Sequence, residues 1–252
     1  MKKIWYILFI VIGLTVNSLG SSRSDVKIIE ATENIRYLGQ KISKDYLYFY
    51  YNPKKRELKE QLLEDIKVIE QSIDDISMST TSIDSKNILD FLTYNTDEIK
   101  ALIEEKSTQE SSILMLDYSE SFLEGANSIA LAHKYEFTSE EKMLMEVKEF
   151  EYLLERVSKY YIASNLNLDK FNNFKHMGDA IVQIENILKA INKYDYPKEL
   201  KEERTTMNKS WKVYREFLYK SQKASLPNLV LLSEKNLKKI VEKIALYHKK
   251  NQ

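Results

Sequence analysis

The amino-acid sequence repeats itself at a fixed interval of 115 residues. The segment Tyr37–Leu47 matches the segment Tyr152–Ile162, and tyrosine, leucine, serine and lysine residues are identical at equivalent positions. The other matching blocks are residues 66–76 with 181–191 and residues 129–134 with 244–249. A single block can arise by chance in a chain rich in lysine and isoleucine. Three blocks in one register indicate an internal duplication.

Each copy shows the hydrophobic periodicity of α-helices. Apolar residues recur every three or four positions through residues 26–51 and again through residues 58–76, and both stretches end at turn-forming sequence, Asn52-Pro53 and Ser77–Ser82. Residues 83–106 and 107–134 predict two further helices, joined either by a tight turn or by no true break. Five glycines and three prolines in 252 residues favour long helices over sheets. The sequence therefore predicts an all-α fold of two tandem antiparallel four-helix bundles.

The predicted units cover residues 25–135 and 139–250. Thr138 or Ser139, followed by Glu140 and Glu141, is typical of a helix N-terminus. Pro197 and Pro227 lie where the last two helices are expected to begin, which suits proline in a first turn. The alternative is that the last helix of the first unit continues into the first helix of the second.

The N-terminus has the three-part plan of a secretory signal peptide. Lys2 and Lys3 precede an apolar run, Ile4–Val16, which is followed by small and polar residues. These 13 residues are fewer than the roughly 20 that span a bilayer as a helix. We therefore expect cleavage near Gly20/Ser21, removal of residues 1–20 and a periplasmic location. An uncleaved N-terminal membrane anchor is the alternative.

The composition excludes several classes of function. The chain has no cysteine, which excludes disulfides, thiolate metal sites, cysteine nucleophiles and a lipoprotein anchor. Its 38 basic and 38 acidic residues give no electrostatic basis for binding nucleic acid. His133, His176 and His248 lack metal-ligand spacing, and no phosphate loop or nucleophile elbow occurs. We expect no metal, no cofactor and no enzymatic activity.

Several short motifs resemble one family of sensory domains. Residues 35–46, IRYLGQKISKDY, resemble the first helix of the PilJ-type domain, the N-terminal domain of type IV pili methyl-accepting chemotaxis transducers. The residues that carry the likeness are Arg36, Leu38, Gln40 and Ile42, with residues 118–130 similar to the final helix and Trp211, Tyr214 and Arg215 similar to the third. The likeness covers most of residues 30–250 as two diverged copies. It implies an extracytoplasmic four-helix sensor bundle, similar to the input domains of nitrate and nitrite sensor kinases.

The resemblance also implies a ligand site on the first helix. In those kinases the arginine that matches Arg36 binds the anion at a dimer interface. Here Arg36, Gln40 and Ser43 share a second helix face with Leu47 and Tyr50, roughly 110° from the apolar stripe, so this face is expected to meet another helix or subunit. The planar donor fork of arginine suits oxyanions. We predict a site at Arg36, Gln40 and Ser43; the alternative is that Arg36 only pairs with a nearby acid such as Glu33.

The second copy differs at this site. Glu151 and Glu155 occupy the positions of Arg36 and Gln40, which predicts at most one anion site per chain. The sequence as given ends without a kinase or methyl-accepting region. We therefore expect a sensory input protein that binds a small anion, nitrate or nitrite by analogy, and signals through a separate membrane sensor kinase or chemoreceptor, with a homodimer possible. The alternative is a ligand-free helical adaptor that binds only proteins.

Overall fold

The computed structural model describes residues 2–133, 135–221 and 226–251, with side chains from Ser24 onward. Within these residues the chain is helical and contains no strand, which confirms the predicted fold class. The helices are α1 (Lys2–Tyr51), α2 (Glu57–Ser79), α3 (Ile83–Glu104), α4 (Gln109–Ala132), α5 (Ser139–Asn165), α6 (Lys170–Lys193), α7 (Lys198–Lys220) and α8 (Pro227–Lys250).

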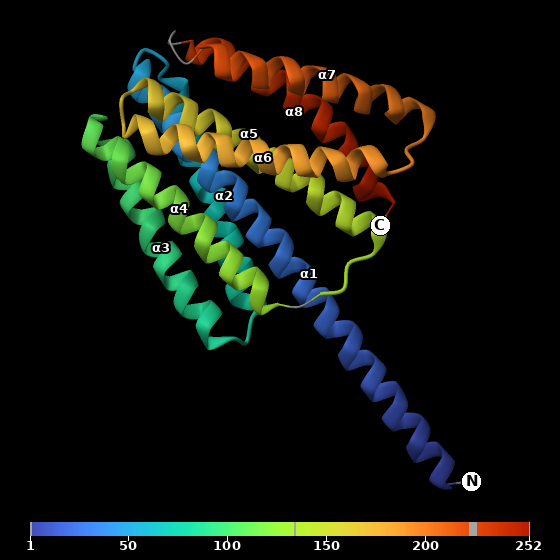
Figure 1. Cartoon of the computed structure of the whole chain (residues 1–252). Coiled ribbons are helices and arrows are strands. Elements are labelled where there is room, and N and C mark those ends of the chain that lie inside the picture. Colours follow the sequence, from blue (N-terminus) through green and yellow to red (C-terminus); the bar gives the residue numbers. More distant parts are fainter. Residues whose placement is uncertain (1, 134, 222–225, 252) are drawn as a thin grey trace.

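The N-terminal part of α1 projects away from the other helices (Figure 1). The predicted signal peptide, residues 1–20, falls in this stretch and lies outside the residues whose side chains are described. Among the described residues, no helix combines the length and the apolarity that crossing a membrane requires.

The helices form two antiparallel four-helix bundles, α1–α4 and α5–α8 (Figure 1). In the first unit α1 packs mainly on α2 and α4, and in the second α5 packs mainly on α6 and α8. The two first helices, α1 and α5, also pack extensively on one another. The junction between the units is therefore built on the pair of equivalent helices.

Each unit buries its own apolar core, and the two cores meet at the junction. Residues at the same offset, such as Ile42 with Val157 and Ile69 with Ile184, are buried in both units. Leu47 of α1 is 0% exposed and packs with the core of the second unit. This confirms that the second face of α1 meets another helix, and burying such a side chain contributes about 1.5–3 kcal/mol.

The ends of the helices follow local sequence signals. α1 ends at Tyr51, before Asn52-Pro53, and α5 begins after Thr138, whose hydroxyl accepts a hydrogen bond from the Glu141 backbone. Pro197 immediately precedes the first residue of α7 and Pro227 is the first residue of α8, so both helices begin where the prolines predicted.

One boundary differs from the sequence prediction. α2 continues through Ser77–Ser79 because burial of Ile76 holds its last turn and the Thr80 backbone still donates to Ile76. α4 ends at Ala132 and α5 begins at Ser139, where the sequence predicted a helix start, so the alternative of one continuous helix is wrong. The end of α4 is fixed by extended backbone at His133.

Two helical glycines should respond in opposite ways to alanine. At Gly39 of α1, a new Cβ would lie 2.8 Å from the Cβ of Phe122 on α4, closer than two such carbons approach. At Gly178 of α6 a new Cβ would meet nothing within 4 Å. We expect Gly39→Ala to destabilise the fold by about 1–3 kcal/mol and Gly178→Ala to stabilise it by about 0.5–1 kcal/mol. Urea unfolding measures both. A stabilising Gly39→Ala would contradict the close packing of α1 on α4.

Candidate functional site

One lysine from the first helix of each unit reaches across the junction and contacts the last helix of the other unit. The ammonium group of Lys44 on α1 lies 2.9 Å from the Glu234 carboxylate on α8. Lys159, at the equivalent position of α5, donates to the hydroxyl of Ser119 on α4 at 2.8 Å. Glu234 and Ser119 are themselves equivalent at the 115-residue offset. The junction is therefore approximately two-fold symmetric, and the first helix of each unit contacts the last helix of the other.

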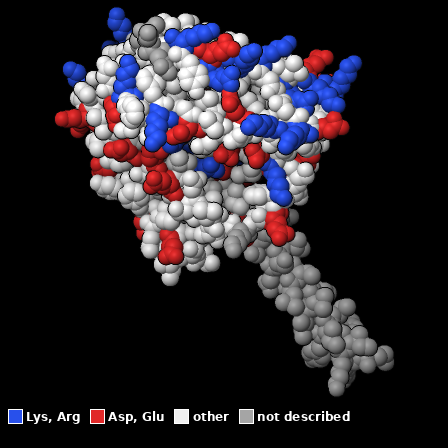
Figure 2. Space-filling model, in the orientation of Figure 1, with Lys and Arg blue, Asp and Glu red and all other residues white. Residues whose placement is uncertain are grey.

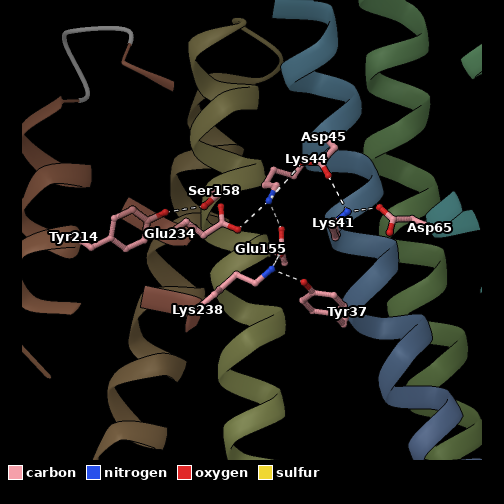
Figure 3. A network of polar contacts seen from close by, with 10 residues as sticks. All are labelled: Tyr37, Lys41, Lys44, Asp45, Asp65, Glu155, Ser158, Tyr214, Glu234 and Lys238. Atoms are coloured by element: carbon pink, nitrogen blue, oxygen red, sulfur yellow. Dashed lines mark hydrogen bonds and ion pairs between the residues drawn. The ribbon is translucent and has the colours of Figure 1, made fainter. Parts of the chain in front are cut away.

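A buried cluster of two lysines and two glutamates forms the Lys44 side of the junction (Figure 3). Glu155 of α5 lies 2.5 Å from the ammonium group of Lys44 and 2.5 Å from that of Lys238. Lys44 also contacts Glu234, and Lys238 donates a hydrogen bond to Tyr37. Glu155 is 0% exposed and Glu234 is 2% exposed. Water cannot compensate these charges, so each depends on the others.

The two carboxylates of this cluster have different protonation behaviour. Burial alone would raise the pKa of Glu155, but Lys44 and Lys238 lower it to about 2. Burial and the charge of Glu155 raise the pKa of Glu234 to about 7. Burial alone would lower the pKa of Lys44, but Glu155 and Glu234 raise it well above its usual value. Near neutral pH the cluster therefore holds two cations and the Glu155 anion, and Glu234 ionises less readily than Glu155.

Further contacts extend the cluster to neighbouring helices (Figure 3). Lys41 lies 3.2 Å from Asp45 and also pairs with Asp65 of α2. On the other side, the hydroxyl groups of Ser158 and Tyr214 are 2.7 Å apart, which connects α5 to α7. The polar network thus joins helices of both units.

The Lys159 side of the junction has a different set of charges. Glu120 of α4 accepts two hydrogen bonds from Arg156, at 3.0 and 2.8 Å, one from Lys159 at 2.7 Å and one from Tyr160 at 3.0 Å. Burial alone would raise the pKa of Glu120, but Lys159 and Arg156 lower it to about 2. Burial lowers the pKa of Lys159 to about 8. Here two cations share one carboxylate.

A cleft of about 430 Å³ adjoins the Lys44 cluster, between α1 and α2 of the first unit and α8 of the second. We call it the basic cleft. Its charged lining residues are Lys41, Lys44, Lys55, Lys235, Lys238, Lys239, Asp45, Glu234 and Glu242. Within the described residues, Lys55, Lys235 and Lys239 form no ion pair, although Lys55 lies over the Tyr48 ring. The basic cleft therefore has positive charge that the fold does not neutralise.

A second cleft of about 230 Å³ occupies the equivalent place on the other side of the junction, between α4 and α5–α6. Residues at the 115-residue offset line both clefts: Leu116 and Leu231, Glu120 and Lys235, Tyr160 and Asp45, Asn173 and Leu58, His176 and Gln61. The lining carboxylates are Asp117, Glu120 and Asp169, and no lysine or arginine lines this cleft. The two clefts thus share a location in the fold and differ in the sign of their charge.

Charge is also unevenly spread over the outer surface. On the face drawn in Figure 2, basic side chains gather over the helices of the second unit, and acidic side chains are more prominent over the first.

The predicted site residues lie at the junction but not in the basic cleft. Arg36 pairs with Glu33 at 2.6 Å and lies over the Tyr152 ring of α5, 4.7 Å from its centroid. Gln40 donates to the Ser119 backbone at 2.9 Å, and Ser43 is fully buried. Arg36 is therefore in the contact with Glu33 that was the alternative interpretation. The anion site at Arg36, Gln40 and Ser43 stays a prediction.

The residues of the Lys44 cluster and the basic cleft were not among the predicted site residues. Lys44 and Lys159 do stand within the longest repeated block, and both copies keep a lysine there. The available signal was that both copies keep a charged residue in a segment that is otherwise mostly buried. It could have indicated that this lysine has a role at the junction. The partners Glu234 and Lys238 could not be assigned, because they come from a distant helix.

The fold and the junction define an all-helical protein of two duplicated bundles, with a charged, partly open interface between them. No family model, no curated protein and no solved structure matches the chain.

Glu151 should make the protein less stable as the pH rises. It occupies the α5 position equivalent to Arg36, and burial, together with the charges of Glu242 and Glu155, raises its pKa to about 7 from an ordinary value of 4.5. The folded protein therefore holds this proton more tightly than the unfolded chain. Its contribution to stability is fully present below about pH 4.5 and is lost as the pH rises through about 7.

Glu151→Gln cannot ionise, so we expect it to stabilise the protein by about 1–3 kcal/mol at pH 8 and to have little effect at pH 5. Urea unfolding at the two pH values measures the difference. An equal effect at both would show that Glu151 is not the group responsible.

Proposed function

We propose that this chain is an exported sensory input module that binds a small anion in the basic cleft and passes its state to a separate membrane protein. The observation that carries the proposal is the charge of the cleft, six lysines against three carboxylates at the junction of two bundles. The resemblance to PilJ-type input domains supports a sensory role, export, and a membrane kinase or chemoreceptor as partner. It also makes nitrate and nitrite the first anions to test.

The basic cleft suits an anion better than the predicted site at Arg36. Arg36 is already paired with Glu33 at 2.6 Å, in a contact protected from solvent. An anion there would have to replace a charge-assisted hydrogen bond worth about 1.5–3 kcal/mol. Lys55, Lys235 and Lys239 form no ion pair within the described part of the chain, so an anion in the cleft displaces no carboxylate.

The position of the cleft explains how binding could be transmitted. One wall belongs to α1 and α2 and the other to α8, so a bound anion would connect the two units. A ligand shifts a conformational equilibrium only by its difference in affinity for the two states. An anion that attracts lysines from both walls favours the packing in which they are close. We propose that this shift in packing at the α1–α5 junction is the signal.

The proposal is tested by isothermal titration calorimetry and thermal unfolding with nitrate, nitrite and phosphate at constant ionic strength. Binding to the folded state must raise the melting temperature. We expect Lys235→Ala/Lys239→Ala, which we call the cleft variant, to lose binding. Glu234→Gln should bind roughly 3- to 10-fold more tightly, because a negative charge leaves the base of the cleft. The control is Lys209→Ala/Lys212→Ala, which removes the same charge from exposed positions on α7.

The outcomes separate the two candidate sites. Binding that survives in the cleft variant but disappears in Arg36→Ala would place the anion at the predicted site on α1. Binding that the control removes as well would reflect only the net charge of the protein. If neither these anions nor an organic anion binds the protein, the sensory proposal fails.

An adaptor that binds only proteins is the second candidate, and one surface feature favours it. Phe91 and Tyr94 stand one helical turn apart on α3 and are 52% and 57% exposed. Exposed aromatic pairs of this kind are characteristic of protein-binding surfaces. Phe91→Ser/Tyr94→Ser should then abolish cross-linking to a membrane partner in cells, while the cleft variant has no effect. That pair of results, with no anion bound, would favour the adaptor.

A further inference from the structure

We infer that the ligand of the basic cleft is an organic molecule carrying a phosphate group. This inference rests on the proposed function and narrows it from small anions in general to one chemical class. It follows from the charge that is available in the cleft, the type of its donors, and its size and apolar wall.

The available charge fits an anion with about two negative charges. Lys41, Lys44 and Lys238 are each held by carboxylates within the network. The cations that form no ion pair among the described residues are Lys55, Lys235 and Lys239, and Glu242 is the lining carboxylate that likewise forms none there. Their formal sum is +2. A phosphate monoester carries about −1.5 to −2 at pH 7, whereas nitrate would neutralise only half of this charge.

The donor type suits a phosphate group. Six lysines line the cleft and no arginine does. The guanidinium fork of arginine matches carboxylate and phosphate groups alike with two parallel hydrogen bonds, so the lack of arginine selects neither group. A lysine ammonium group is a compact charge with three donors on a flexible stem, so several lysines can surround the oxygens of a tetrahedral group.

The size of the cleft calls for more than an inorganic ion. Its volume of about 430 Å³ lies within the usual range for small-molecule sites, roughly 300–1,000 Å³. A water molecule takes about 30 Å³ in the liquid, so an inorganic phosphate ion would leave most of the cleft to solvent. Leu58 and Leu231 line the cleft beside the lysines and provide an apolar wall. An organic group attached to the phosphate would cover this wall.

The equivalent cleft on the other side of the junction is an internal comparison. It has the same place in the fold, but Glu120 stands where the basic cleft has Lys235, and Asn173 stands where it has Leu58. The duplicated fold alone therefore does not create a phosphate site. The features that fit a phosphate ligand belong to the residues of the basic cleft, so we expect one ligand per chain.

The test compares four probes by isothermal titration calorimetry on the full chain at constant ionic strength: phenyl phosphate, inorganic phosphate, benzoate and nitrate. Benzoate keeps the ring of phenyl phosphate but carries a planar group with a single charge. We expect phenyl phosphate to bind at a stoichiometry near one, and at least about tenfold more tightly than the other three. One additional charge-assisted hydrogen bond would give this difference against benzoate and nitrate. Against inorganic phosphate, the difference would come from burial of the ring on Leu58 and Leu231.

Lys235→Ala/Lys239→Ala should weaken the binding of phenyl phosphate by about tenfold or more, and Lys209→Ala/Lys212→Ala should leave it unchanged. Both lysines of the cleft variant are exposed, so it should fold, which circular dichroism checks. A lipid headgroup is a second source of the same phosphate chemistry. Sedimentation with phosphatidylglycerol vesicles tests it: lysine-dependent vesicle binding, at an affinity above that for phenyl phosphate, would assign the phosphate to a lipid.

The results separate this inference from the proposed function. If nitrate or benzoate binds in the cleft as tightly as phenyl phosphate, the anion site stands and the phosphate class is wrong. If inorganic phosphate binds as tightly as phenyl phosphate, the organic part of the inference is wrong. If no probe binds and vesicles do not bind, both proposals fail.

Discussion

Glu155→Gln should reduce the free energy of unfolding by about 3–5 kcal/mol, because it removes the shared partner of two buried lysines. Glu155 is 0% exposed and contacts both Lys44 and Lys238 at 2.5 Å. After the substitution, Lys44 keeps Glu234 and a longer contact of 3.6 Å with Asp45, and Lys238 keeps the Tyr37 hydroxyl. Urea unfolding at pH 7 measures the loss, which corresponds to a fall of about 10 °C in melting temperature for a chain of this size.

A matched control is available one turn earlier on the same helix. Glu151→Gln is chemically the same change, but Glu151 has a raised pKa and forms no ion pair among the described residues, so at pH 8 the substitution should stabilise the protein. Opposite signs for two Glu→Gln changes four residues apart would show that the buried lysines, and not helix propensity, determine the effect. If Glu155→Gln costs under 1 kcal/mol, the network does not hold the units together, contrary to the magnitude expected of a buried ion cluster.

The glutamine in this test also has a counterpart in the natural sequence. Gln40 occupies the equivalent position of α1 and donates to the Ser119 backbone. On that side of the junction Lys159 contacts the neutral Ser119 and takes its carboxylate from Glu120. Both copies therefore have a buried lysine at the helix junction, but the carboxylates that pair with it come from different positions: Glu155 and Glu234 for Lys44, and Glu120 for Lys159. Glu155→Gln introduces the glutamine found on the Lys159 side, but it does not introduce a carboxylate equivalent to Glu120 to pair with Lys44.

The fold could be predicted because its signals are local. Apolar stripes with a period of three or four residues define helices that bury one face, and Ile42 with Val157 shows that both copies bury the same positions. Helix ends such as Thr138 and Pro227 are fixed by residues within one turn. The constant 115-residue offset between the copies then predicted two equivalent units, but it did not predict how the two units pack on one another.

The site could be predicted only in part, because its contacts are not local. The helix face containing Gln40, Ser43 and Leu47 was expected to meet a second helix, and the burial of Leu47 against the second unit confirms this. What the face meets depends on residues as far apart as Lys44 and Glu234, and no periodicity links two positions separated by 190 residues. The family resemblance directed attention to Arg36, whereas the lysines that form no ion pair among the described residues are Lys55, just before α2, and Lys235 and Lys239 on α8.

The repeat also places an equivalent histidine contact at the far end of each bundle. His133 lies 3.1 Å from Asp25, and His248 lies 2.7 Å from Glu140, with both pairs at the 115-residue offset. The second ring nitrogen of each histidine contacts a hydroxyl from the connection between the second and third helices of its unit, Thr80 at 3.2 Å and Tyr196 at 2.8 Å. Each histidine thus ties the start of its unit's first helix to the end of the last.

The two histidines should nevertheless differ in their contribution to stability. The side chain of His248 is 0% exposed, and its ring packs against Tyr194 and Tyr196, with ring centroids 4.9 and 5.4 Å away. The side chain of His133 is 12% exposed and has no such aromatic surroundings in the described residues. We expect His248→Ala to cost about 2–4 kcal/mol through a cavity and two lost hydrogen bonds, and His133→Ala about 1 kcal/mol.

Urea unfolding measures both losses, and hydrogen exchange locates them. In His248→Ala the faster-exchanging amides should lie in the first turns of α5 and the last turns of α8, because the contact joins these ends. His248→Gln should recover part of the stability, since the glutamine amide can still donate to Glu140 while the ring contacts are lost. Equal costs for His133→Ala and His248→Ala would contradict the argument. They would mean that the hydrogen bonds common to both units, and not the aromatic packing found in the second, account for the stability.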